Sequence, residues 1–185
     1  MKRIITLIMA FFVFGLIAAP VHADGVSTSD PSAKTDYSAL AATGADNRSA
    51  VLHAYLASKD SPMANEAGYF VSEADRLNLD WKLVAAIAGV ESTFGQHIPT
   101  GSYNAFGWGV FTGMQDGVHF ASWKDGIHEV SEGLRTRYMN KGAVTVDQIG
   151  RIYAASPTWS YKVKYFINDI EKFSSKTTAS LAVTI

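Results

Sequence analysis

The sequence predicts a mainly α-helical domain, a helical bundle around a buried central helix with a small glycine-rich lobe of loops and short β-strands. Three observations support this fold class. Apolar residues recur at helical spacing from Arg48 onward. The segment Leu83–Val90 is apolar on nearly all sides, which is typical of a buried helix. Glycines then recur at high density between Gly95 and Gly117, which excludes a helix there and favours turns.

The chain begins with the features of a secretory signal. Lys2 and Arg3 provide positive charge, Ile4–Ala19 form an apolar run, and Val21-His22-Ala23 fits the small-x-small rule for cleavage. The run is short for a membrane span of about 20 residues. We therefore expect residues 1–23 to be removed, leaving an exported protein, secreted or in the cell envelope, without a stable membrane span. An uncleaved anchor helix is the alternative.

Composition narrows the functional classes. The net charge of -1 provides no basic footprint for nucleic acid. The chain has no cysteine, which excludes disulfides, a thiol nucleophile and thiolate metal sites. Residues 24–47 are rich in Ser, Thr, Ala, Asp and Gly, as in a flexible linker. We expect one domain over residues 48–174, a tail over 175–185, and a monomer, since no heptad stripe is visible.

Start and stop signals delimit the predicted helices. Before the lobe they are Arg48–Ser58, Ser61 to about Leu77, and Trp81 to about Glu91 with Asp80 as cap. After the lobe they run from Ser122 or Trp123 to Gly142, from the capping box Thr145–Gln148 to Ser156-Pro157, and from about Ser160 to Phe173. The residues expected inside are Val51, Leu52, Tyr55, Leu56, Met63, Ala67, Phe70, Val71, Ala74, Ile127, Val130, Leu134, Tyr138, Val146, Ile149, Ile152, Tyr153, Val163, Phe166, Ile167 and Ile170.

Glu91 is the candidate catalytic residue. It ends the apolar central helix, and no Lys or Arg lies within one helical turn of it; the nearest upstream basic residue is Lys82. Because burying an unpaired carboxylate is costly, desolvation should raise the pKa of Glu91. A glutamic acid that stays neutral near pH 7 can protonate a glycosidic oxygen. A glutamate that only caps or pairs at a helix end is the alternative.

Three segments around this residue form an ordered set of motifs. They are Glu91-Ser-Thr-Phe-Gly95, Tyr103-Asn-Ala-Phe-Gly107, and Tyr153-Ala-Ala-Ser-Pro-Thr-Trp159 with the helix behind it. Together they resemble the lysozyme-like superfamily of peptidoglycan hydrolases, closest to its glucosaminidase-type branch. The Glu-Ser-x-Phe element is equally similar to lytic transglycosylases. The resemblance covers about Ser61–Phe173.

The resemblance implies an exported enzyme that cuts β-1,4 bonds between amino sugars in peptidoglycan. Glu91 matches the catalytic acid, and Tyr153 matches a tyrosine that orients or stabilises the reacting sugar. N-acetylglucosaminidase, muramidase and lytic transglycosylase activities all stay open. No cofactor is implied, and the expected partner is the glycan strand. The candidate substrate-binding residues are Ser92, Tyr103, Asn104, Phe106 and Trp159; for the aromatic ones, core packing is the alternative.

The sequence does not clearly provide the second catalytic carboxylate that a two-carboxylate hydrolase needs. Inverting glycosidases place a second carboxylate about 6.5–9.5 Å from the acid, and retaining ones about 5–5.5 Å. The lobe offers only Asp116, as a base or as a turn residue before Gly117. Asp125 is more simply explained as stabilising a helix start. Without a second carboxylate, Glu91 could act as acid and then base, giving an anhydro sugar as lytic transglycosylases do.

Two other functional hypotheses stay open besides an enzyme. The chain could be a catalytically inactive wall-binding module of the same fold, or a small exported structural or inhibitor protein. His97, His119 and His128 match no His-Glu-x-x-His spacing, so no metal site is predicted. A Ser-His-Asp arrangement is not predicted either.

Overall fold

The computed structural model describes residues 46–109 and 117–182, with side chains as far as Lys176. Within these ranges the regular structure is helical and contains no strand, which confirms the mainly α-helical class. The described parts of the glycine-rich lobe form turns, so the expected short strands are not found there. The predicted signal segment, most of the predicted linker and Asp116 lie outside the described residues.

Helix α2 (Arg48–Ser58) has the predicted limits and buries the predicted face. It packs against α3 and α7. The ring of Tyr55 makes edge contacts with Phe94 and Phe173, at centroid distances of 5.7 and 5.6 Å. Such aromatic contacts add to apolar burial, so α2 joins the early helices to the last one.

The second predicted helix is split in two. A short 3₁₀ turn, η1 (Ala64–Glu66), precedes α3 (Ala67–Leu77), which ends where predicted. The buried hydroxyl of Ser61 accepts the N–H of Met63 and also donates to the carbonyl oxygen of Phe94 at 2.8 Å. Ser61 therefore ties this turn to the chain that follows α4, instead of starting one continuous α-helix.

Helix α4 (Leu83–Ser92) confirms the prediction of a buried helix, since all its residues except Val90 and Glu91 are buried. It packs mainly against α7. A Cβ atom at Gly89 would lie 2.7 Å from the ring of Phe94 and 3.0 Å from that of Phe166. Only glycine lets these two rings close over the end of α4 that carries Glu91.

Helix α5 (Trp123–Gly133) starts at the predicted cap. The Ser122 hydroxyl accepts the Asp125 N–H at 3.1 Å, and the Asp125 carboxylate accepts the Ala121 N–H at 2.9 Å. Asp125 thus stabilises the helix start, as expected, and does so by a hydrogen bond as well as by its charge.

The helix then changes its winding before the predicted stop. A π-helical turn, η2 (Leu134–Tyr138), and a 3₁₀ turn, η3 (Met139–Lys141), follow α5 and end at Gly142, whose φ is 94°. Glycine adopts this left-handed conformation without steric cost, which explains the stop. The sequence pattern did not predict the π-helical turn.

Helix α6 (Val146–Tyr153) begins with the predicted capping box between Thr145 and Gln148. It ends at Tyr153, earlier than the Ser-Pro pair that was expected to stop it. Ile149 is buried, but Ile152 is 64% exposed, so these two apolar residues of the helix do not share one buried face.

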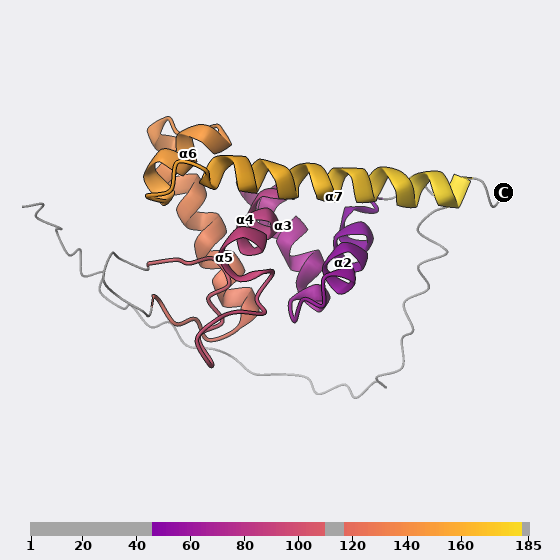
Figure 1. Cartoon of the computed structure of the whole chain (residues 1–185), viewed down its shortest axis with the longest axis horizontal. Helices are drawn as coiled ribbons and strands as arrows, with labels where there is room; N and C mark the ends of the chain where they lie inside the picture. Colours follow the sequence, from indigo (N-terminus) through magenta and orange to yellow (C-terminus); the bar gives the residue numbers. More distant parts are fainter. Residues whose placement is uncertain (1–45, 110–116, 183–185) are drawn as a thin grey trace, which may run out of the picture. The chain divides into compact units, whose positions relative to one another are not determined.

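The last helix, α7 (Trp159–Ala182), packs against α2, α4 and α6 (Figure 1). Val163 and Ile170 are fully buried, and Phe166 and Ile167 pack at the edge of the core, as predicted. The helix continues past its predicted end at Phe173, so the expected tail starts as helix. In the described part of the chain, no helix combines the length and apolarity needed to cross a membrane.

Candidate active site

The chain reverses direction directly after Glu91. Thr93, Phe94 and Gly95 have consecutive positive φ values of 53°, 59° and 88°. A left-handed conformation costs a non-glycine residue about 1–2 kcal/mol, so the surrounding contacts must hold it. The Phe94 N–H donates to the Ala88 carbonyl at 3.0 Å, and the Phe94 ring is buried. The end of α4 and its glutamate are therefore fixed in place.

Ser92 links this reversal to the glycine-rich lobe. Its hydroxyl lies 2.7 Å from the Ala105 carbonyl oxygen and 3.1 Å from that of Ala88, and it accepts the Gly95 N–H at 2.8 Å. The side chain is buried. Ser92, a predicted substrate-binding residue, thus directs its hydrogen bonds to the backbone and leaves little surface for a ligand.

Asn104 shapes the lobe in the same way. Its amide nitrogen donates to the carbonyl oxygens of Trp108 and Val118, at 2.8 and 2.9 Å. Its amide oxygen accepts the N–H groups of Trp108 and Phe106, at 3.0 and 3.3 Å. This buried side chain therefore closes the loop that carries Phe106 and Gly107.

Gly107 brings that loop against the catalytic candidate. A Cβ atom at this position would lie 2.8 Å from Oε2 and 3.2 Å from Cδ of Glu91. Gly107 also has a φ of 62°, which favours glycine. The loop can pass this close to the carboxyl group only because residue 107 has no side chain.

Trp159 provides the one hydrogen bond to this carboxyl group among the described residues. Its indole Nε1–H donates to Oε1 of Glu91 at 2.6 Å. The Trp159 side chain is 3% exposed, so its ring offers almost no face for a sugar. A Cβ at Gly150 would lie 2.9 Å from the Trp159 ring, so this glycine makes room for the indole.

Tyr153 lies beside Trp159 and is anchored on the lobe. The two rings stack at 4.8 Å with an interplanar angle of 24°. The Tyr153 hydroxyl donates to the Phe106 carbonyl oxygen at 2.6 Å. Burial and, next, the charge of Glu91 raise the pKa of Tyr153 well above its ordinary value. Tyr153 therefore reaches Glu91 through its neighbours and makes no hydrogen bond to it.

The pKa of Glu91 is shifted upward, as the sequence predicts. Desolvation raises the pKa of Glu91, against smaller opposing effects of the Trp159 hydrogen bond and the charge of Lys162. Glu91 makes no ion pair with any described residue. Glu91 is nevertheless exposed. Solvent therefore reaches this residue although desolvation raises its pKa.

The remaining aromatic candidates pack mainly in the interior. Phe106 is fully buried, and Tyr103 is partly buried against Trp123 with ring centroids 5.1 Å apart. Trp108 lies between Tyr138 and Tyr153, at 6.2 and 5.8 Å. Within the described residues, no second carboxylate interacts with Glu91.

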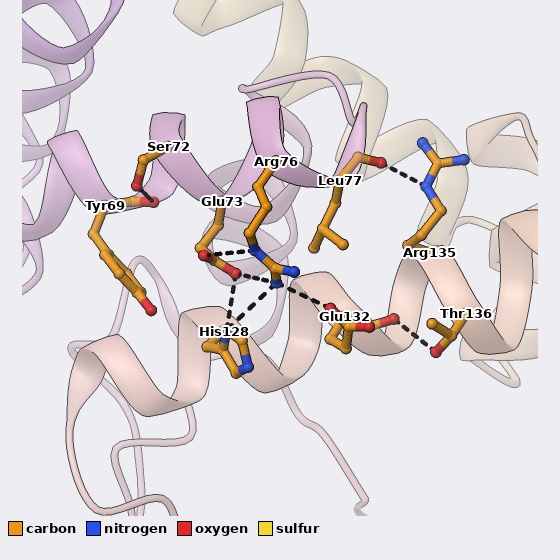
Figure 2. A network of polar contacts seen from close by, with 9 residues as sticks. All are labelled: Tyr69, Ser72, Glu73, Arg76, Leu77, His128, Glu132, Arg135 and Thr136. Carbon is orange, nitrogen blue, oxygen red and sulfur yellow. Dashed lines mark hydrogen bonds and ion pairs between the residues drawn. The ribbon is translucent and has the colours of Figure 1, made fainter. Parts of the chain in front are cut away.

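A second polar site lies between α3 and α5 and is shown in Figure 2. The Glu73 cluster consists of Glu73, Arg76, His128 and Glu132. Arg76 donates to both oxygens of Glu73, at 2.7 and 3.1 Å, and to Glu132 at 2.9 Å. His128 Nδ1 lies 2.9 Å from Glu73 Oε2. His128 is therefore part of a polar network, and the described residues include no cluster of three or more His, Cys, Asp or Glu side chains able to hold a metal ion.

A pocket of 320 Å³ opens where α6 ends and α7 begins. Glu91 does not line it, so this pocket is separate from the carboxyl group. Its lining residues are Gly150, Arg151, Ala154, Ala155, Ser156, Pro157 and Ser160.

Two comparisons with known proteins identify no related protein. No protein-family profile matches the chain, and a search of curated proteins finds no significant match. A functional assignment must therefore rest on the geometry and chemistry around Glu91.

Proposed function

We propose that this chain is a lysozyme-like enzyme that cleaves peptidoglycan glycan strands, with Glu91 as general acid. One observation carries the proposal. Glu91 is open to solvent, lacks an ion-pair partner among the described residues, and has a pKa raised by desolvation. A carboxylic acid with a raised pKa keeps its proton to higher pH than an ordinary glutamic acid, and an exposed one can still meet a substrate.

Contacts between distant segments support a common site. A Cβ atom at Gly107 would lie 2.8 Å from Oε2 of Glu91, and the Tyr153 hydroxyl donates to the carbonyl oxygen of Phe106. Trp159, from the third motif, donates to Glu91 itself. Three motifs that are far apart in the sequence thus meet around one carboxyl group.

The reaction begins with proton transfer from Glu91 to the glycosidic oxygen. The bond between that oxygen and the anomeric carbon breaks, and the leaving sugar departs as an alcohol. Glu91, now a carboxylate, then accepts a proton from the group that attacks the anomeric carbon. Attack by water gives hydrolysis, and attack by a hydroxyl group of the same sugar gives an anhydro product.

The surroundings of Glu91 favour the second route. No second carboxylate among the described residues interacts with it, and transglycosylation needs none. Asp116, outside the described residues, is the candidate base for hydrolysis. Mass spectrometry of released fragments separates the two routes, because only transglycosylation yields anhydro ends, and it also identifies the bond that is cut.

A zymogram tests the activity itself. Residues 24–185 should clear peptidoglycan in a gel, and Glu91→Gln should not. Glu129→Gln is a matched control, because Glu129 is exposed and makes no described contact with Glu91. Equal clearing by wild type and Glu91→Gln would refute the catalytic assignment. Binding to peptidoglycan without clearing would indicate the inactive wall-binding module instead.

A further inference from the structure

The two oxygens of the Glu91 carboxyl group have different surroundings. Oε1 accepts the indole N–H of Trp159 at 2.6 Å, whereas Oε2 faces the backbone of Gly107. An indole nitrogen donates a hydrogen bond and cannot accept one. The carbonyl oxygen of a protonated carboxyl group is a better acceptor than its O–H oxygen, so this bond favours a proton on Oε2 when Glu91 is protonated.

We propose that Trp159 is a positioning residue that assigns the catalytic proton of Glu91 to Oε2. This inference rests on the proposed function. In the first step the proton moves from Oε2 to the glycosidic oxygen as the bond to the anomeric carbon breaks. The negative charge left on the carboxylate is then stabilised by the N–H of Trp159, and Oε2 is again free to accept a proton.

The indole is held so that it can do this without rearranging. Trp159 is buried, stacks on Tyr153 and fits against Gly150. Tyr153 is in turn anchored by its hydroxyl group on the lobe carbonyl of Phe106. A donor that is fixed before the reaction stabilises developing charge better than one that must reorient.

The hydrogen bond also offsets part of the effect of desolvation on the pKa of Glu91. A donor to the ionised form lowers the pKa of a carboxyl group, and burial raises it. The charge of Lys162 on α7 also lowers the pKa of Glu91, whereas for neighbouring Tyr153 on α6 the charge of Glu91 helps to raise the pKa of the tyrosine. Intermediate proton affinity suits a residue that must first give and then retake a proton.

Nuclear magnetic resonance tests the contact in the wild-type protein without requiring cleavage. The indole N–H signal of Trp159 should shift with pH at the same midpoint as the carboxyl carbon of Glu91. That shift should disappear in Glu91→Gln. An indole signal that does not follow the titration of Glu91 would overturn the inference, even if the protein cleaves glycans.

Trp159→Phe then tests the role. The ring is kept and the N–H is lost, so the pKa of Glu91 should rise and the basic limb of the pH–rate profile should move to higher pH. Because the carboxyl group loses its orientation, kcat should fall up to about 100-fold with little change in KM. Trp108→Phe is the packing control, since Trp108 also contacts Tyr153 but makes no hydrogen bond to Glu91.

The outcomes separate this inference from the proposed function. An unchanged Glu91 pKa in Trp159→Phe, or an equal shift in Trp108→Phe, would overturn the positioning role. If wild-type protein does not cleave peptidoglycan, the proposed function fails, while the two resonance measurements still decide whether Trp159 controls the carboxyl group.

Discussion

Two glutamates of this protein show opposite ways of placing a carboxyl group. Glu73 is 6% exposed and bonds to Arg76 and His128, and its pKa is lowered first by the Arg76 hydrogen bond. Glu91 is exposed, and Trp159 is its one hydrogen-bond donor among the described residues; its pKa is raised by desolvation. At Glu73 the hydrogen bond from a charged partner outweighs desolvation, whereas at Glu91 desolvation outweighs a neutral donor, so the exposed fraction alone does not decide which carboxyl group keeps its proton longer.

The largest expected effect is on catalysis, at the unpaired glutamate. Glu91→Gln should lower the rate of peptidoglycan cleavage about 1,000-fold, because the general acid is lost. Thermal unfolding should show no loss of stability, since no ion pair to a described residue is broken. Turbidity loss of a cell-wall suspension measures the rate. A matching loss of melting temperature would place Glu91 with Glu73 as a structural residue and break the comparison.

The contact between Gly107 and Glu91 can be tested by adding one methyl group. Gly107→Ala should lower the cleavage rate about 10- to 100-fold, because the new Cβ displaces the carboxyl group. It should also cost about 1–2 kcal/mol of stability through the positive φ. Gly101→Ala is the matched control: Gly101 has a φ of 71°, but its Cβ would meet nothing within 4 Å. Equal loss of activity in both variants would mean that backbone strain, not contact with Glu91, is responsible.

The Glu73 cluster should show the opposite response. Glu73→Gln removes the charge that pairs with Arg76 and His128, so we expect a loss of about 2 kcal/mol in the free energy of unfolding. The cleavage rate per folded molecule should be unchanged. Urea denaturation measures the stability. If Glu73→Gln lowered the cleavage rate as much as Glu91→Gln, the Glu73 cluster drawn in Figure 2 would be part of the catalytic site.

Part of this contrast can be predicted from the sequence. Glu73 has Arg76 one helical turn away, whereas Glu91 has no basic residue within a turn, and this absence was one reason to identify Glu91 as the catalytic candidate. The other partners come from distant segments. His128 lies 55 positions from Glu73, and Trp159 lies 68 positions from Glu91. Short motifs place such residues near a site but do not show which atoms meet.

Residue type also left the roles of the motif residues undecided. Ser92 and Asn104 have the polar groups of ligand-binding residues, but their hydrogen bonds go to the backbone of the reversal and of the lobe. Trp159 has the ring of a sugar-stacking residue, yet it is buried and acts through its N–H. Whether a polar group is satisfied inside the protein depends on tertiary contacts, which spacing along the chain does not specify.

The smallest expected effect concerns the free energy of unfolding. As pH changes, the contributions of Glu73 and Glu91 to it should change in opposite directions. The pKa of Glu73 is lowered by folding, so its stabilisation is present above the unfolded value of about 4.3 and is lost as pH falls through the lower folded value. The pKa of Glu91 is raised, so the protonated form favours folding at low pH and this advantage disappears as pH rises through the folded value.

Glutamine should therefore shift stability in opposite directions at neutral pH. Glu91→Gln removes a partly desolvated charge and should be slightly more stable than wild type at pH 7, with the gain vanishing near pH 3. Glu73→Gln should lose most at pH 7 and least near pH 3. Urea denaturation of both variants across this range measures the difference from wild type. If both variants changed the free energy of unfolding in the same direction at pH 7, the two carboxyl groups would have pKa values shifted in the same direction. Glu91 would then lack the raised pKa expected of a general acid.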